Sequence, residues 1–356
     1  MQTTNKSCRI GLRIVAFFAV LVIINICLSF LLCPLENASG KVWYAYNSEQ
    51  NDIDTLFVGS SLIACSVNPY EYDAIANTRS FNFGTPCQHV NQSIEAIETV
   101  ISDCELKTIV LAVDYGELTQ PVNINAKAAF QQAKVSTLNP IEKAGYFCKQ
   151  AFARDSIMNP ESINYFIPWI YNNVSISPSL ILSNVQAKIS GKTDILGDDY
   201  VGRGYSTNDK NLPENGEILQ QNHWDEYGAF NTDTISIIID LIQLCNSRDI
   251  RLILVVPPHP RFDIVDYLPS YYSYYAELSQ ILGEYEVEFY DFNFAIPEYF
   301  TFDPQYFSDF EHLNTLGATE FSRMLAKFLQ QSKENDMSSC FYEYDEYVNV
   351  VLKQQG

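Results

Sequence analysis

The segment NDIDTLFVGSSLIAC, residues 51–65, decides the fold. Residues 53–58 form a mostly apolar, partly β-branched run that stops at Gly59, which predicts a buried strand of a parallel sheet. Two serines and a short apolar segment follow Gly59, as in a turn from a strand into a helix. Such a turn would present a serine at the carboxyl edge of the sheet, where open α/β sheets bind ligands. An ordinary loop with a serine at a helix N-cap is the alternative.

Strands and helices alternate on both sides of a long polar region. Strands are also predicted at 79–83, 107–113, 250–256 and 286–290. Helices are predicted at 70–77, 91–102, 232–246, 273–282 and 315–330. This β-α-β order predicts a doubly wound α/β domain with a parallel sheet, which we place at residues 52–330.

The polar region between the two halves, about 119–230, is expected to be an insertion over the carboxyl edge of the sheet. It is rich in Pro, Gly and Asn, with helices predicted near 139–153 and 160–172 and a loop at 197–205. An insertion at this edge could form a lid or a substrate wall. The acidic, Tyr-rich tail, 331–356, has no predicted place in the fold.

The N-terminus is predicted to be a transmembrane signal anchor. Lys6, Arg9 and Arg13 precede an uncharged run, residues 14–32, which at ~1.5 Å per residue spans about 29 Å, close to the thickness of a bilayer. The preceding cations place residues 1–13 in the cytoplasm and the main domain outside the cell. Residues 33–51 are expected to form a connector between the membrane run and the main domain. A cleaved signal peptide is the alternative, although the run is long for one and ends in a poor cleavage site.

Composition and charge restrict the partners. The chain has 356 residues, 23 of them Tyr and 22 Phe, and only 18% are charged, which is typical of a globular protein. Beyond the membrane run it carries 19 basic and 43 acidic residues, a balance of −24 that disfavours nucleic acid and anionic lipid. A neutral polymer, a zwitterion or a cationic group is a better partner, unless the acidity only confers solubility.

Cysteines and histidines give no sign of a metal site. The nine cysteines contain no CxxC pair, and those outside the membrane run could form disulfides or be buried as small apolar residues. The four histidines show no HxH or HExxH spacing. We therefore predict neither a metal nor a cofactor.

The C-terminal half of the sequence contains the groups that a nucleophilic serine needs. Asp309 and His312 lie three residues apart between the last strand and the last helix, so they can share one face. The aspartate can orient the imidazole, whose other nitrogen can take the proton of Ser61. Since parallel strands end at one edge, residues 61 and 312 can meet across the sheet.

At these residues the sequence resembles the SGNH/GDSL hydrolase superfamily, over about 52–118 and 232–330. The resemblance rests on Gly59-Ser60-Ser61, on Gly84 after the second strand, and on Asp309-x-x-His312. It implies that Ser61 is the nucleophile, that His312 is the base and that Asp309 orients the base. It also implies an oxyanion hole built from the backbone N–H groups of Ser61 and Gly84.

The chain departs from the family pattern in two places. Ser60 replaces the usual aspartate, and Asp114 follows the third strand where the family has a Gly-x-Asn-Asp block. An ionised Asp114 cannot donate a hydrogen bond, and one lost oxyanion donor can cost a factor of about 10²–10³ in rate. Asn82 or the Tyr115 hydroxyl is expected to substitute.

Two histidines near the same edge are further candidates. His259 lies in Pro-Pro-His-Pro after the fourth strand and is expected to line the site, although a rigid surface turn is an equal alternative. His89 follows Gly84 and could lie near the site as well.

The resemblance implies a flavodoxin-like three-layer α/β/α sandwich with a parallel sheet, tethered by the N-terminal transmembrane helix. It implies a membrane-anchored, extracytoplasmic serine esterase or O-acyltransferase acting on acyl esters of a cell-surface polysaccharide or teichoic acid-like polymer. A membrane-bound O-acyltransferase is a candidate partner. The alternative is a non-catalytic module of the same fold that binds a glycan or a partner protein.

Overall fold

The computed structural model describes residues 2–33, 37–50, 52–137, 177–190, 196–212 and 222–352, with a few positions between 141 and 169. Residues 41–127 and 196–356 form one compact unit, and residues 1–40 with 128–195 form another. The helices predicted near 139–153 and 160–172 lie almost entirely outside the described residues.

The larger unit is built on a five-stranded sheet with the order β2-β1-β3-β6-β7, in which every neighbouring pair is parallel. The strands are β1 (Thr55–Gly59), β2 (Ser80–Gly84), β3 (Thr108–Ala112), β6 (Arg251–Val256) and β7 (Glu288–Asp291). The predicted α/β class and parallel sheet are confirmed. Because β2 and β3 lie on opposite sides of β1, the carboxyl ends of β1 and β3 flank a topological switch point, the usual place for a ligand.

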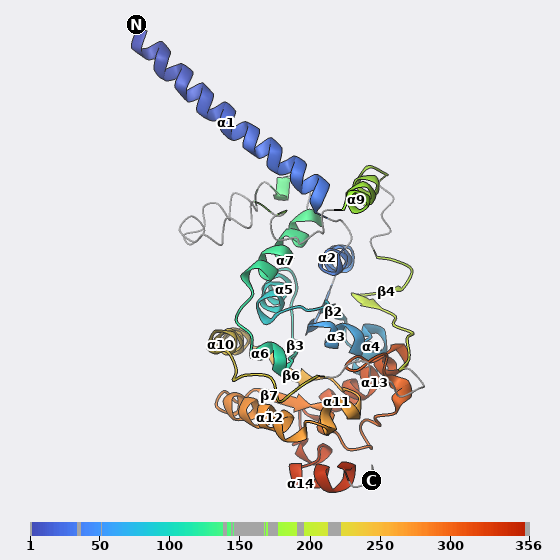
Figure 1. The fold of residues 1–356 in the computed structure, drawn as a ribbon. Helices are drawn as coiled ribbons and strands as arrows, with labels where there is room; N and C mark the ends of the chain where they lie inside the picture. The colour runs from blue at the N-terminus through green and yellow to red at the C-terminus, as the bar shows by residue number, and fades with distance from the viewer. Residues whose placement is uncertain are drawn as a thin grey trace. The chain divides into compact units, whose positions relative to one another are not determined.

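Helices cover both faces of this sheet (Figure 1). Phe57, Val110 and Ile253 are aligned across β1, β3 and β6, and they belong to the same buried cluster as Phe321 and Leu325 of α13 (Thr315–Gln331). Neighbouring strand residues face the opposite side, where α5 (Val90–Asp103) and α10 (Thr232–Ser247) pack on each other and on the sheet. The core is therefore a three-layer sandwich, as predicted.

The five helices predicted in this unit are observed close to their predicted residues, except that α12 (Leu268–Gly283) begins five residues earlier. The described helices of this unit are α2 (Ala38–Glu49), α3 (Ser61–Ser66), α4 (Pro69–Ala76), α5 (Val90–Asp103), α6 (Tyr115–Leu118), α7 (Ile124–Thr137), α10 (Thr232–Ser247), α11 (Arg261–Val265), α12 (Leu268–Gly283), α13 (Thr315–Gln331) and α14 (Tyr344–Tyr347), of which α2 and α7 extend into the other unit. Helix α2 was not predicted, because the sequence suggested only a connector there. Its Trp43 and Tyr46 are fully buried against Phe81 and Phe83 of β2.

The prediction of a loop at 197–205 is wrong in part. Strands β4 (Tyr200–Gly202) and β5 (Tyr205–Ser206) form a small antiparallel hairpin there. Gly204 has φ +82°, and a Cβ on it would lie 1.9 Å from the carbonyl oxygen of Asn82. The glycine that suggested a loop instead allows the hairpin to approach the end of β2 closely.

The described part of the C-terminal tail, up to residue 352, packs on the main domain. Tyr347 is buried against Phe294, and the ring of Phe341 stacks on Tyr290 of β7. Its aromatic residues thus cover apolar surface at the β7 edge of the sheet.

The smaller unit contains α1 (Gln2–Leu32) and α9 (Pro178–Ser190). Within α1, residues Arg9–Leu32 are long and apolar enough to cross a membrane, a property that N-terminal signal sequences share. The amide of Asn184 donates to the carbonyl oxygens of Leu31 and Cys33, which α1 leaves without helical partners.

Candidate active site

The turn after β1 places Ser61 at the first residue of α3. Gly59 has φ +146°, and a Cβ there would lie 2.8 Å from the carbonyl oxygen of Ala112, so only glycine fits beside β3. The hydroxyl of Ser60 caps α3 by accepting the N–H of Leu62 at 3.4 Å. The helix therefore begins at Ser61, whose side chain stays partly exposed.

Asp309 and His312 lie on a tight loop before α13. The loop is closed by an antiparallel bridge between Phe307 and Leu313, and Asn314 caps the helix that follows. Oδ1 of Asp309 accepts the backbone N–H groups of Glu311 and His312, at 3.0 and 2.9 Å. These bonds fix the carboxylate before it meets the imidazole.

The structure brings Ser61, His312 and Asp309 into one hydrogen-bonded chain. Nδ1 of His312 lies 2.9 and 3.0 Å from the two carboxylate oxygens of Asp309, and Nε2 lies 2.8 Å from Oγ of Ser61. With the Nδ1 proton donated to Asp309, Nε2 is free to accept the serine proton. This is the order of groups that activates a serine for nucleophilic attack.

The electrostatics of Asp309 favour a charged orienting group. Burial raises its pKa, but the hydrogen bond and charge of His312, together with the two backbone N–H groups, outweigh burial and lower the pKa to about 2. Asp309 therefore stays ionised at neutral pH, as a group that stabilises an imidazolium must.

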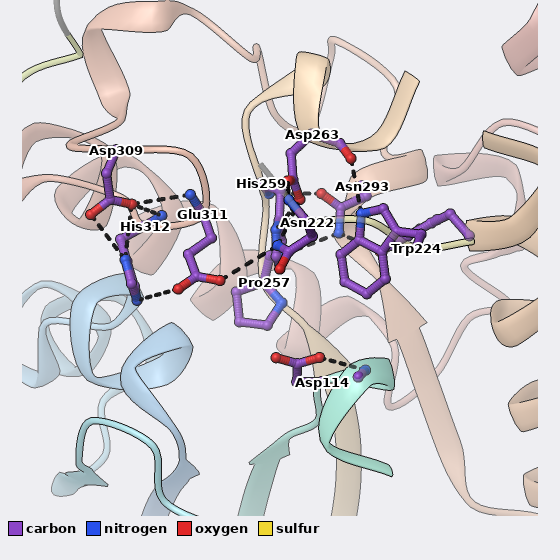
Figure 2. A network of polar contacts seen from close by, with 12 residues as sticks. Asp114, Asn222, Trp224, Pro257, His259, Asp263, Asn293, Asp309, Glu311 and His312 are labelled. Atoms are coloured by element: carbon purple, nitrogen blue, oxygen red, sulfur yellow. Dashed lines mark hydrogen bonds and ion pairs between the residues drawn. The ribbon is translucent and has the colours of Figure 1, made fainter. Parts of the chain in front are cut away.

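A second carboxyl group lies on the other side of the imidazole. Oε1 of Glu311 is 3.6 Å from Nε2 of His312, so Asp309 and Glu311 flank the ring (Figure 2). Burial raises the pKa of Glu311, and the nearby Asp114 carboxyl adds to the shift. Glu311 thus lines the same cavity as Ser61.

A cavity of about 240 Å³ opens in front of Ser61. It lies at the switch point between β1 and β3 and is lined by residues from five separate segments. Its polar lining includes Ser61, His89, Asp114, Glu117, Tyr227 and Glu311. Tyr227 belongs to the predicted insertion, so this part of the insertion does contribute to the wall of the cavity.

One wall of the cavity is formed by His89 and Glu117. Their side chains approach to 4.0 Å, but burial lowers the pKa of His89 and raises the pKa of Glu117 to about 8. Both groups are therefore neutral near pH 7 and form no ion pair. Glu117 is held in place by the backbone N–H of Val90.

Glu117→Gln is expected to stabilise the domain at alkaline pH. The folded state keeps a proton that the unfolded carboxyl releases near 4.5, so the stabilisation is complete below about pH 4.5 and is lost as pH rises through about 8. Since one pKa unit corresponds to about 1.4 kcal/mol, the variant should gain at least about 1 kcal/mol over wild type between about pH 5 and pH 8. Urea unfolding at both pH values measures this difference.

Glu98→Gln, at an exposed position of α5, is the matched control and should follow wild type at both pH values. If Glu117→Gln also followed wild type, Glu117 would not be a buried neutral acid.

The oxyanion donors expected from the sequence are engaged elsewhere. The backbone N–H of Gly84 donates to Oδ1 of Asn82 at 3.0 Å. The amide of Asn82 donates to the carbonyl oxygens of Ile63 and Val67, at 2.9 and 2.7 Å, and the side chain is fully buried. Both predicted roles need correction, because Asn82 instead ties the end of β2 to α3.

Tyr115 and His259 do not line the cavity either. The phenol of Tyr115 is buried and donates to Asp291 at 2.8 Å. Nδ1 of His259 lies 3.0 Å from Asp263, and Trp224 packs on the imidazole ring (Figure 2). His259 is buried, so the surface turn suggested as an alternative is also wrong.

Sequence reasoning missed Glu117, Glu311 and Tyr227. Glu311 lies inside the Asp309–His312 motif, and its position beside the histidine could have indicated it. Glu117 follows β3 within one turn of α6, so it also lies at the ligand-binding edge. No sequence pattern indicated Tyr227, because its place depends on how the insertion folds back.

Comparisons with known proteins find similarity among solved structures but not at the level of sequence. The sequence matches no protein-family model and no curated protein. Among solved structures it is similar to a Bacteroides fragilis crystal structure described as a "putative acylhydrolase", with 13% identity, 81% of this chain and 95% of that chain covered, and a TM-score of 0.38. The roles of the site residues therefore rest on the geometry of this chain.

Proposed function

We propose that this chain is a serine esterase or O-acyltransferase in which Ser61 is acylated. The observation that carries the proposal is the 2.8 Å contact between Oγ of Ser61 and Nε2 of His312, with Asp309 bonded to the other ring nitrogen. The cavity at the switch point gives an ester room to reach Oγ.

The chemistry runs in two halves. Oγ of Ser61 attacks the ester carbonyl carbon while Nε2 of His312 takes the serine proton. The tetrahedral intermediate collapses, the C–O bond to the leaving alcohol breaks, and His312 returns the proton to that alcohol. A second hydroxyl then attacks the acyl-serine with the same proton transfers, and it frees Ser61.

The second hydroxyl decides the type of enzyme. Water as the acceptor gives an esterase, whereas a sugar hydroxyl gives an acyltransferase. The acidic main domain is better suited to a neutral or zwitterionic glycan than to a polyanion. We place the substrate among acyl esters of cell-surface polysaccharide, or of teichoic acid-like polymers whose phosphate charges are balanced by cationic substituents, with a membrane-bound O-acyltransferase as a partner.

The apolar helix Arg9–Leu32 would anchor the enzyme in the cell membrane, with the N-terminus in the cytoplasm and the main domain outside. Protease added to intact cells should then digest the main domain. Full protection until the cells are permeabilised would reverse this orientation.

Acyl-enzyme trapping tests the activity. The purified full chain is mixed with 4-nitrophenyl acetate, quenched in acid and digested, and the peptide that contains Ser61 is weighed by mass spectrometry. We expect an acetyl group on Ser61 and a burst of nitrophenol. An unmodified peptide from folded protein would contradict the proposal.

One observation favours a second candidate, a glycan-binding module without catalysis. The N–H of Gly84 is bonded to Asn82, which leaves the expected oxyanion hole short of a donor. A binding module would show saturable binding of an acylated glycan with neither acyl-Ser61 nor a nitrophenol burst.

A further inference from the structure

One carboxyl oxygen beside the imidazole of His312 is available to a bound molecule. Oε1 of Glu311 lies 3.6 Å from Nε2 of His312, which is too far for a hydrogen bond, and it accepts no hydrogen bond from any other described residue. The side chain of Glu311 is 23% exposed and lines the cavity in front of Ser61. A molecule in the cavity can therefore contact Oε1 and Nε2 together.

The fold holds this carboxyl group in place. The backbone N–H of Glu311 donates at 3.0 Å to Oδ1 of Asp309, the same atom that contacts the imidazole. The amide of Asn222 donates to the other carboxyl oxygen, Oε2, at 3.5 Å (Figure 2). Asn222 is itself fixed, because its backbone N–H donates to Asp263 at 2.7 Å. Oε2 is thus bound to the insertion, and Oε1 remains beside Nε2.

The second half of the proposed reaction needs an acceptor hydroxyl at Nε2. In the acyl-enzyme, Oγ of Ser61 is esterified and no longer donates to His312, so Nε2 can take the proton of the attacking hydroxyl. That hydroxyl has to lie within about 3 Å of Nε2. Its single proton goes to Nε2, so a hydrogen bond to Oε1 of Glu311 needs a second donor on the acceptor.

A sugar ring carries such a second donor at a suitable distance. Hydroxyl oxygens on adjacent ring carbons are roughly as far apart as two hydrogen-bonded oxygens, about 2.8 Å. Two such hydroxyls can face two acceptors that are 3.6 Å apart through nearly parallel hydrogen bonds. The cavity of about 240 Å³ has room for an acceptor much larger than a water molecule, which occupies about 30 Å³.

We infer that Glu311 binds the acceptor and selects a vicinal diol, as on a sugar ring, by accepting a hydrogen bond from the hydroxyl next to the attacking one. The inference rests on the proposed function and names its acceptor. The attacking oxygen bonds to the acyl carbon, the electron pair of the carbonyl π bond moves onto oxygen, and the hydroxyl proton goes to Nε2 of His312. Collapse of this intermediate breaks the Oγ–C bond, and His312 returns the proton to Ser61. Glu311 transfers no proton.

This role does not depend on the protonation state of Glu311. A carboxyl group accepts a hydrogen bond when it is neutral, and a stronger one when it is ionised. Asp309 is bonded to the other ring nitrogen of His312, so the imidazolium already has a stabilising carboxylate. The expected effect of Glu311 is therefore on the choice of acceptor.

Competition between two acceptors tests the inference. The purified full chain is acetylated with 4-nitrophenyl acetate in an equimolar mixture of cis-cyclohexane-1,2-diol and cyclohexanol, and the two acetate esters are measured by chromatography. Both alcohols react with the same acyl-enzyme, so slower acylation or a weaker base does not change the ratio of the products. Wild type should favour the diol by about tenfold or more, as expected for a hydrogen bond to a charged group.

Glu311→Leu should lower this ratio to the one expected from the number of hydroxyls alone. Glu311→Gln keeps an acceptor oxygen and should retain part of the preference. Glu117→Gln is the matched control, because it changes a carboxyl group on another wall of the same cavity, and it should keep the wild-type ratio. A wild-type ratio in Glu311→Leu, or no preference for the diol in wild type, would overturn the inference.

The nitrophenol burst separates this inference from the proposed function. A burst with an acetyl group on Ser61, followed by free acetate as the only product, would overturn the inference and leave a serine esterase. Folded wild type that gives no burst and no acetyl-Ser61 is the failure of the proposed function, and the inference would then fall with it.

Discussion

Ser61→Ala is expected to lower the rate of ester hydrolysis by about 10⁶-fold, to the level left by binding and oxyanion contacts alone. Ser61 carries the only atom assigned to bond formation with the acyl group. Its hydroxyl contacts His312, and its side chain is partly exposed, so the fold should survive the change. Steady-state hydrolysis of 4-nitrophenyl acetate, with circular dichroism as a check on folding, measures the effect.

Ser60→Ala is the matched control for this variant. The two serines are adjacent, but Ser60 caps α3 and has no chemical step. Its replacement should cost about 1 kcal/mol of stability and leave the rate within a few-fold of wild type. A Ser61→Ala variant as active as Ser60→Ala would place the nucleophile elsewhere.

His312→Ala is expected to lower the rate by a similar factor of about 10⁶, because the serine hydroxyl is a weak nucleophile without its base. Asp309→Asn should cost about 10⁴, since it disturbs the tautomer and the charge stabilisation but leaves the imidazole in place. The same hydrolysis assay ranks the two variants.

The losses of activity caused by replacing two residues that act together in catalysis are not additive. The double variant Ser61→Ala/His312→Ala should be no slower than either single variant, because the two residues act as one unit. His223→Ala is the control, as His223 is exposed and bonds to Tyr267 away from the cavity. Losses that multiply in the double variant would contradict a shared catalytic role.

The sheet could be predicted because its strands carry their own signal. Each is a short apolar run ended by Gly, Pro or Asp, and all five observed strands fall within about two residues of the expected ranges. Their parallel order follows from the helices between them. The pairing of Ser61 with His312 follows in turn, since the first and last segments of such a sheet end at one edge.

The finer features of the site depend on contacts that the sequence does not encode locally. Asn82 looked like a free donor, but its amide donates to a carbonyl group within α3 and to another just after α3, and its oxygen accepts the N–H of Gly84. Tyr115 and Asp114 are neighbours, yet α6 turns the phenol into the core and leaves the carboxyl group on the cavity. Which of two adjacent polar side chains faces the ligand is decided by a helix of one turn.

The β4–β5 hairpin and the C-terminal tail could not be predicted from the local sequence either. Strands β4 and β5 span only five residues in total and contain a glycine, so they carry no period of two to recognise. The acidic, Tyr-rich tail had no predicted place, although Tyr347 and Phe341 pack their rings on the domain. Both segments are held by tertiary packing rather than by local preference.

Labelling with a fluorophosphonate probe tests most directly whether Ser61 is an activated nucleophile. Wild type should be labelled, and the probe should map to the peptide that contains Ser61. Ser61→Ala should not be labelled, and Ser60→Ala should be labelled like wild type. Equal labelling of wild type and Ser61→Ala, or none in folded wild type, would contradict the account.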